Sequence, residues 1–201
     1  MSEHTNIDTV IVNAAFALAA EFGWARMSIG DIAEKANLSE VTVRTRYPAK
    51  ALLLNEFMRH IDDLVLAQNA PFDEFDSDRD RIFEILMLRF EAMQPYKESL
   101  RQIARDLPKN PISAIANGPS AALSMAKMLA AANQTANGLL GIAHAHGLLV
   151  AWLATARVWL QDDSPDMTRT MAALDRNLRR GEKCLNMLPR LTPSRKAQSS
   201  P

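Results

Sequence analysis

The chain of 201 residues is 48% hydrophobic, so it is long and apolar enough to bury a sizeable core. Its 23 Lys and Arg balance its 23 Asp and Glu, and this zero formal net charge excludes a basic surface spread over the whole chain. The single cysteine, Cys184, excludes an intramolecular disulfide and a zinc site built from several cysteines.

Two helices are predicted at the start of the chain. The second begins after Ser28, which forms a capping-box-like pair with Asp31. Asn37 tolerates the left-handed conformation common at a helix C-terminus, and it marks the turn that follows. The first helix covers residues 7–22 up to Gly23, and its apolar face carries Ile7, Val10, Ile11, Ala14, Leu18 and Phe22.

A further short helix is predicted after Ser39, its expected N-cap. Val43 is its inward-facing anchor, and Pro48 ends it because proline disfavours helical backbone at Tyr47. Residues 28–50 therefore have the pattern of a helix-turn-helix, and the helix that follows completes a small DNA-reading domain. The alternative is a pair of turns in an ordinary helical core.

Residues 7–60 resemble the N-terminal domain of the TetR family of transcriptional regulators. The family pattern is matched by Phe22, Gly23, Ile29, Asp31, Ile32, Ala33, Leu38, Ser39, Thr42, Tyr47, Pro48 and Lys50. The chain departs from it at Val41, where the family usually has glycine, and at Arg44 and Arg46, where it usually has aromatic residues.

The resemblance implies that the second short helix lies in the major groove of DNA. Thr42 and Lys50 would then reach phosphates, and Glu40 and Thr45 would lie near base edges. The residues expected at DNA are Ser39, Glu40, Thr42, Arg44, Thr45, Arg46, Tyr47 and Lys50.

Positive charge in this domain is local. Residues 1–70 hold six Lys and Arg against nine Asp and Glu. Arg44, Arg46 and Lys50 must therefore supply the attraction to phosphates, and we expect modest non-specific affinity for DNA.

A loop over residues 70–80, with Pro71 and several acidic residues, predicts a boundary between a head over 1–69 and a body over 78–188. The helix predicted over residues 81–93 is apolar on more than one side, and Pro95 interrupts it. The fold class predicted is all-α, with a small helix-turn-helix head and a larger helical ligand-binding and dimerisation body. Residues 189–201 are predicted to be a disordered tail.

Further prolines favour an irregular, hollow body. Pro108, Pro111 and the Gly118–Pro119 pair are expected to break the chain into short pieces before a helix over residues 121–132. A small apolar ligand would occupy the space that such breaks leave, because methionine adapts to differently shaped ligands. The alternative is that the same side chains are plain core. The residues expected to line the site are Met87, Phe90, Met125, Met128, Leu148 and Trp152.

The last two helices carry the predicted dimer interface. Residues 142–160 are apolar almost all round, and residues 164–166 have the sequence Ser-Pro-Asp, which predicts the start of the final helix. The pair resembles the helices that form the four-helix dimer interface of TetR-family regulators, and we expect Trp159 to lie in it. The alternative is that both helices complete the core of a monomer.

Other classes of protein have little support in the sequence. No glycine-rich phosphate loop or nucleophile elbow is present, and His144 and His146 are two positions apart, which does not suit paired metal ligands on a helix. We expect no enzyme activity, metal or cofactor. The polar N-terminus and an apolar run of about ten residues at 147–156 predict a cytoplasmic protein without a transmembrane helix.

A second resemblance offers an alternative function. Residues 80–182, including RDRIFEILMLRFEAMQPYKESLRQIARDLP, are similar to bacterial proteins related to the ubiquinone-biosynthesis accessory factor of the coenzyme Q complex. That factor has the TetR fold but binds lipid. Two functions follow: a TetR-type repressor controlled by a small apolar ligand and binding operator DNA as a homodimer, or a lipid- or isoprenoid-binding accessory protein of the same fold.

Overall fold

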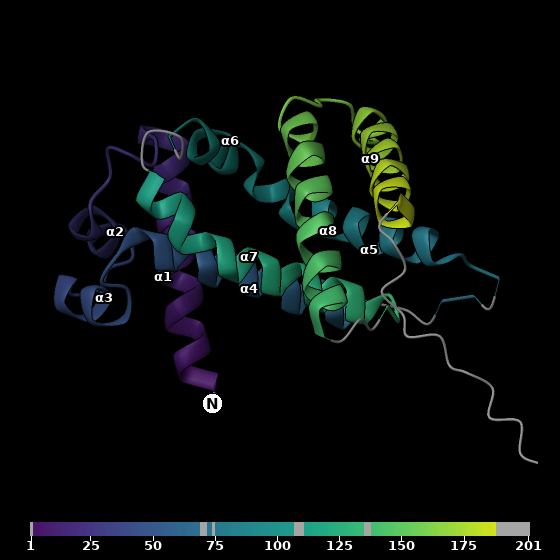
Figure 1. Cartoon of the computed structure of the whole chain (residues 1–201). Coiled ribbons are helices and arrows are strands. Elements are labelled where there is room, and N and C mark those ends of the chain that lie inside the picture. The colour runs from purple at the N-terminus through teal and green to yellow at the C-terminus, as the bar shows by residue number, and fades with distance from the viewer. Residues whose placement is uncertain (1, 69–71, 74, 107–110, 135–137, 188–201) are drawn as a thin grey trace, which may run out of the picture.

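The computed structural model describes residues 2–68, 72–73, 75–106, 111–134 and 138–187. All regular secondary structure in these residues is helical, which confirms the all-α prediction. The elements are α1 (Ser2–Phe22), α2 (Ile29–Lys35), α3 (Glu40–Arg46), α4 (Lys50–Gln68), α5 (Asp78–Met93), the 3-10 turn η1 (Gln94–Tyr96), α6 (Lys97–Asp106), α7 (Pro111–Ala131), α8 (Gly138–Trp159) and α9 (Thr168–Met187) (Figure 1).

The long helix α4 connects the two ends of the molecule. Figure 1 shows α1, α2 and α3 at one end and α8 beside α9 at the other, with α4 and α7 running along each other between them. α4 packs against α1 on one side and against α5 and α7 on the other. The predicted division into a head and a body stays a prediction, because α4 contributes to both.

Three aromatic rings join α1, α4 and η1. Phe16 and Phe57 stack with ring centroids 4.1 Å apart. Tyr96 meets both rings edge-on, at 5.6 Å from Phe16 and 4.9 Å from Phe57. Such edge-on pairs stabilise a core beyond the area they bury, so the junction at η1 is firmly packed. Pro95 ends α5 as predicted and forms this turn.

Trp159 belongs to the core of the single chain. Its side chain is 2% exposed, its ring lies 5.6 Å from that of Phe90, and its indole N–H donates to Gln94 Oε1 at 3.0 Å. The expectation that Trp159 faces a partner subunit is therefore wrong. The physical reason is η1, which brings the amide of Gln94 to the indole and fixes the ring inward.

The expected break at Gly118–Pro119 is absent, because α7 is continuous over Pro111–Ala131 with Pro119 inside it. Proline within a helix removes one hydrogen bond and costs about 3 kcal/mol. The buried second half of α7, including Met125, Met128 and Leu129, offsets that cost by packing within the core. Pro111 stands at the first helical position, where no N–H is needed.

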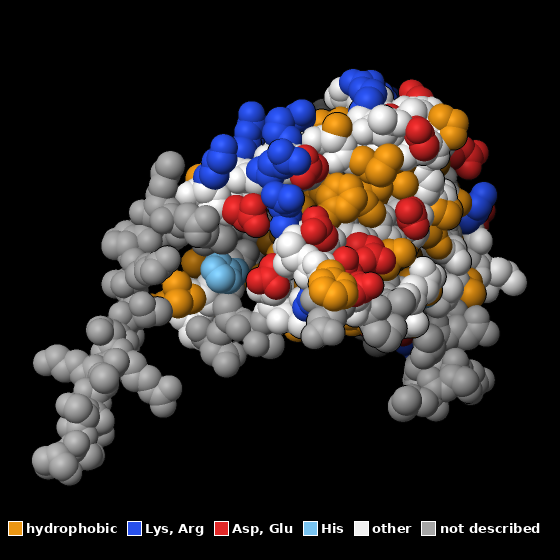
Figure 2. All heavy atoms as spheres, turned by 90° about the vertical axis from the view of Figure 1, so that its right-hand side faces the viewer, with side chains coloured by type: hydrophobic (Ala, Val, Ile, Leu, Met, Phe, Trp, Pro, Cys, Tyr) orange, Lys and Arg blue, Asp and Glu red, His pale blue; other side chains and the backbone are white. Residues whose placement is uncertain are grey.

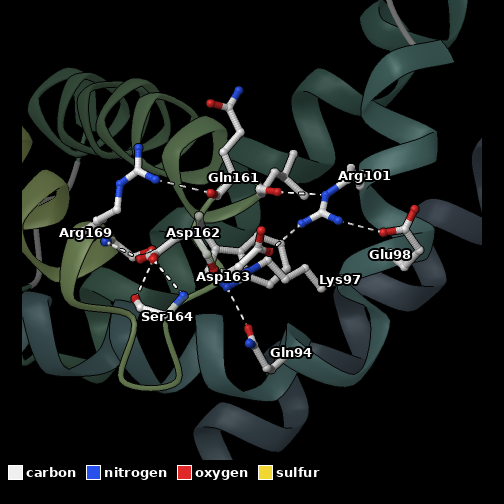
Figure 3. A network of polar contacts seen from close by, with 12 residues as sticks. Gln94, Lys97, Glu98, Arg101, Gln161, Asp162, Asp163, Ser164 and Arg169 are labelled. Carbon is white, nitrogen blue, oxygen red and sulfur yellow. Dashed lines mark hydrogen bonds and ion pairs between the residues drawn. The ribbon is translucent and has the colours of Figure 1, made fainter.

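The final helix begins later than predicted. α9 starts at Thr168, and residues 164–167 form a turn in which Met167 has a φ of 52°, a left-handed backbone that stops a helix from running through from Pro165. The buried carboxylate of Asp162 caps the helix. It accepts from the backbone N–H of Thr170 at 2.8 Å, from the Thr170 hydroxyl at 2.7 Å and from the Ser164 hydroxyl at 2.5 Å (Figure 3).

The loop between α8 and α9 is also bonded to α6. Arg101 donates to the carbonyl of Leu160 at 2.8 Å and pairs with Asp163 at 3.1 Å. Lys97 donates to the carbonyl of Asp162 and lies 5.3 Å from the centre of the Trp159 ring (Figure 3). The loop between α8 and α9 is therefore held by two side chains of α6.

Replacing Asp162 with asparagine is expected to lower the free energy of unfolding by about 2 kcal/mol at neutral pH, the range for hydrogen bonds to a charged group. Burial raises the pKa of Asp162, but the hydrogen bonds from Ser164 and Thr170 outweigh it and hold the pKa well below its ordinary value. The carboxylate's contribution is complete above the unfolded-state pKa of about 4 and is lost as pH falls through the lower folded-state pKa.

Urea denaturation at several pH values measures this effect. The stability difference between the wild type and Asp162→Asn should therefore shrink as the solution is acidified. Asp163→Asn is the matched control, because that neighbouring side chain is 83% exposed and should change stability little. Equal losses in the two variants would contradict the capping role of Asp162.

Candidate nucleic-acid interface

Local capping chemistry forms the two short helices. Ser28 Oγ accepts from the N–H of Asp31 at 3.1 Å, and the Asp31 carboxylate accepts from the N–H of Ser28 at 2.7 Å, which completes the predicted capping box. These bonds hold the pKa of Asp31 below its ordinary value. Asn37 has a φ of 54°, as its position at the turn predicted. Ser39 caps α3 by accepting from the N–H of Thr42 at 3.1 Å.

Helix α3 presents most of its surface to solvent. Val43 is completely buried and anchors the helix on α2, as predicted. Val41 is 76% exposed. A seven-residue helix that is capped at its start and buries one side chain is well placed to enter a DNA groove.

The exposed polar side chains of α3 are paired within the chain. Arg44 forms an ion pair with Glu40 one turn earlier. The hydroxyl of Thr45 donates to the carbonyl of Val41 at 2.7 Å, and Ser39 Oγ lies 2.7 Å from Thr42 Oγ1. Arg44 and Glu40 are both about half exposed, so this pair can open toward a phosphate at little cost.

The end of α3 is tied to the first helix. Arg46 pairs with the carboxylate of Asp8 at 2.9 Å, and the Tyr47 hydroxyl donates to the same oxygen at 3.0 Å. Burial and this hydrogen bond raise the pKa of the Tyr47 phenol, so it stays a donor at neutral pH. Asp8 thereby fixes α3 on α1, a role that was not predicted from the sequence.

The side chain of Lys50 forms its hydrogen bonds within the N-terminal domain. Its amine donates to the carbonyls of Trp24 at 2.7 Å and Met27 at 2.6 Å and lies 5.7 Å from the centre of the Trp24 ring. Burial lowers the pKa of Lys50, and the nearby carboxylates of Asp106 and Asp31 oppose that effect. The amine joins the segment after α1 to the start of α4, so its predicted contact with phosphate would require these bonds to be given up.

The eight residues predicted at DNA therefore all lie within residues 39–50 but have different local roles. Ser39 caps α3 and its hydroxyl bonds that of Thr42, Arg46 and Tyr47 anchor the end of the helix, and Lys50 braces the domain. The groups left at the exposed surface are Glu40, Arg44 and Thr45, together with Val41. Their contact with DNA stays a prediction.

A second feature is an apolar groove of about 730 Å³ at the other end of the molecule, between α8 and α9 and the facing ends of α5 and α7. Its apolar lining includes Ile82, Leu129, Leu148, Ala151, Ala154 and Leu178. Of the six residues predicted to bind a ligand, Leu148 lines this groove. The other five are buried in the core beside it: Met87, Phe90, Met125, Met128 and Trp152.

Helix α8 also carries an exposed apolar row. Leu139 is 86% exposed and Val150 68%, and Ile142 and Leu153 lie on the same side. By length and composition α8 could cross a membrane, and 28% of its most apolar stretch is buried. One such helix is weak evidence for a membrane span, because core helices of soluble proteins meet the same criterion. Contiguous exposed apolar side chains of this kind are typical of protein–protein contacts.

Basic side chains gather away from the helix-turn-helix. Figure 2 shows Lys and Arg side chains grouped on one side of the face that carries α9. The exposed basic residues of that helix include Arg176, Arg179, Arg180 and Lys183, of which Arg179 pairs with Asp175 at 2.9 Å. The positive charge of α3 is small by comparison, in keeping with the modest affinity for DNA expected from the sequence.

Comparisons with known proteins identify the N-terminal domain. Residues 11–57 match the family model of bacterial regulatory proteins, tetR family. No curated protein matches the chain. The resemblance of residues 80–182 to ubiquinone-biosynthesis accessory proteins is therefore not supported by these comparisons.

Solved structures share the fold over nearly the whole chain. A TetR transcriptional regulator from Nitrosomonas europaea is 20% identical with a TM-score of 0.70, covering 89% of this chain and 99% of its own. A TetR regulator from a Rhodococcus species is 15% identical with a TM-score of 0.67, covering 94% and 100%. FadR from Thermus thermophilus, a TetR-family repressor solved with lauroyl-CoA, is 19% identical with a TM-score of 0.56, covering 93% and 98%.

Proposed function

We propose that the chain, whose residues 11–57 match the family model of bacterial regulatory proteins, tetR family, is a DNA-binding transcriptional regulator that acts as a repressor in the cytoplasm. The observation that carries the proposal is α3, a capped and largely exposed helix that follows α2 after a tight turn. Residues on such a second helix reach base edges in the major groove.

The regulator works as a homodimer in this proposal. The exposed apolar row on α8 supplies the surface, because Leu139, Ile142, Val150 and Leu153 gain free energy when a second copy covers them. A two-fold dimer also presents two copies of α3, which suits two half-sites about one duplex turn apart, ~34 to 36 Å.

A small apolar ligand controls DNA binding in this proposal. The groove of about 730 Å³ has the size of small-molecule sites, ~300 to 1,000 Å³, and a mostly apolar lining. Lauroyl-CoA, the ligand solved with the Thermus thermophilus repressor, carries an acyl chain of the kind such a groove fits. α5, α7 and α8 line the groove, and α4 packs on α5 and α7, so a ligand that shifts these helices also shifts the support of the DNA-reading end.

Replacing Arg44 with alanine is expected to weaken binding to every duplex and to reduce the slope of log K against log salt by about one, because one phosphate contact is lost. Fluorescence anisotropy over a salt series measures the slope. Arg176→Ala is the matched control, since Arg176 is an exposed arginine on α9, far from α3 (Figure 1). Equal slopes for Arg44→Ala and the wild type would remove Arg44 from the DNA contact.

A further inference from the structure

The outward surface of α3 carries two exposed side chains with methyl groups, Val41 and Thr45. Val41 is 76% exposed, whereas Val43, the other valine of α3, is fully buried. Thr45 lies one turn after Val41, and its hydroxyl is turned back to the Val41 carbonyl at 2.7 Å. The methyl groups of these two side chains therefore form one exposed strip.

The hydrogen-bonding groups beside this strip are already paired. The next row of α3 holds the Glu40–Arg44 ion pair, and the Ser39 and Thr42 hydroxyls bond each other at 2.7 Å. A contact of the Arg44 guanidinium with a base edge would require its pair with Glu40 to open. Apolar contact is the chemistry that Val41 and Thr45 offer without breaking any bond.

In the major groove one base carries a matching group. The thymine C5-methyl is the apolar feature that distinguishes thymine there, and side-chain methyls are its usual partners. Val41 and Thr45 are four residues apart on a helix, about 6 Å along its axis at ~1.5 Å per residue. That spacing is slightly less than two base steps of ~3.4 Å.

We propose that Val41 and Thr45 make α3 select thymine by its methyl group, at two positions no more than two base steps apart in each half-site. The inference rests on the proposed DNA-binding function and adds to it the class of base that is read. Valine is held in one preferred rotamer on a helix, so little freedom is lost when its methyls meet the base.

The test uses duplexes selected by the wild-type protein from a random pool, in which each thymine is replaced in turn by deoxyuridine. This change removes only the C5-methyl and keeps the base pair. Affinity for the duplex should fall about fourfold at each of two positions, the worth of one buried methyl group, ~0.8 kcal/mol. Substitution at the remaining thymines should have little effect.

Two conservative variants assign the positions. Val41→Ala should abolish the loss at one position, and Thr45→Ser, which keeps the hydroxyl and removes only the methyl, should abolish it at the other. Both side chains are exposed, and thermal denaturation of each variant should match the wild type.

The outcomes separate this inference from the proposed function. Sequence-specific binding that is indifferent to deoxyuridine at every thymine would overturn the methyl readout and leave the regulator intact. Sensitivity that persists unchanged in both variants would also overturn it. Failure of the folded wild type to bind any duplex would overturn both.

Discussion

Replacing Arg89 with methionine is expected to lower the free energy of unfolding by about 3 to 5 kcal/mol, because the buried carboxylate of Asp62 then keeps only the partly exposed amine of Lys127, 3.9 Å away, as a cationic neighbour. Arg89 is 1% and Asp62 2% exposed, and the two form an ion pair between α5 and α4. Ser124 of α7 donates to the same carboxylate at 2.8 Å. Burial lowers the pKa of Arg89, and the charge of Asp62 opposes that effect.

Urea denaturation of Arg89→Met and of the double variant Asp62→Leu with Arg89→Met distinguishes the pair from its packing. The double variant removes both charges, so it should recover much of the stability that the single variant loses. A single variant within about 1 kcal/mol of the wild type would show that the pair does not hold α4 in place.

Replacing Val150 with glutamate is expected to convert the proposed dimer to a monomer. Val150 is 68% exposed in the middle of the apolar row on α8, where it also lines the groove, and burying a carboxylate there against a second copy costs several kcal/mol. The dissociation constant of the dimer should rise by about 100-fold or more. Analytical ultracentrifugation at micromolar concentration measures the change.

Val41→Glu is the matched control for the dimer experiment. It places the same charge at an exposed valine of α3, at the opposite end of the molecule, and should leave the dimer unchanged (Figure 1). A wild-type chain that sediments as a monomer, or a Val150→Glu variant that remains dimeric, would remove α8 as the interface.

The parts of the fold that follow from neighbouring residues were predictable from the sequence. The capping box of Ser28 and Asp31, the turn at Asn37 and the cap at Ser39 depend on residues within four positions of one another. Each was predicted, and each is present. Such local hydrogen bonds need no knowledge of the tertiary structure.

Contacts between distant segments were not predictable in the same way. Lys50 was expected at phosphate, but its amine binds carbonyls 26 and 23 positions earlier, at Trp24 and Met27. Arg46 meets Asp8, 38 positions away. A basic residue on an exposed helix looks the same in the sequence whether its partner is a phosphate or a distant carboxylate.

The body shows the same limit for apolar residues. α8 is apolar almost all round, so its sequence does not reveal that Trp159 points inward while Val150 points outward. Likewise, Met125 and Met128 share one helix face, but only the packed structure places them in the core beside the groove rather than in its lining. Helical periodicity identifies a buried face and does not identify its neighbour.

The central claim, that the chain binds DNA through α3, is tested most directly by selecting duplexes from a random pool with the folded wild-type protein and titrating the enriched duplex with salt. We predict enrichment of an inverted repeat whose half-sites lie about one duplex turn apart, and an affinity that falls linearly as log K against log salt. A folded protein that shows no salt-sensitive association with any duplex in the pool would contradict the account.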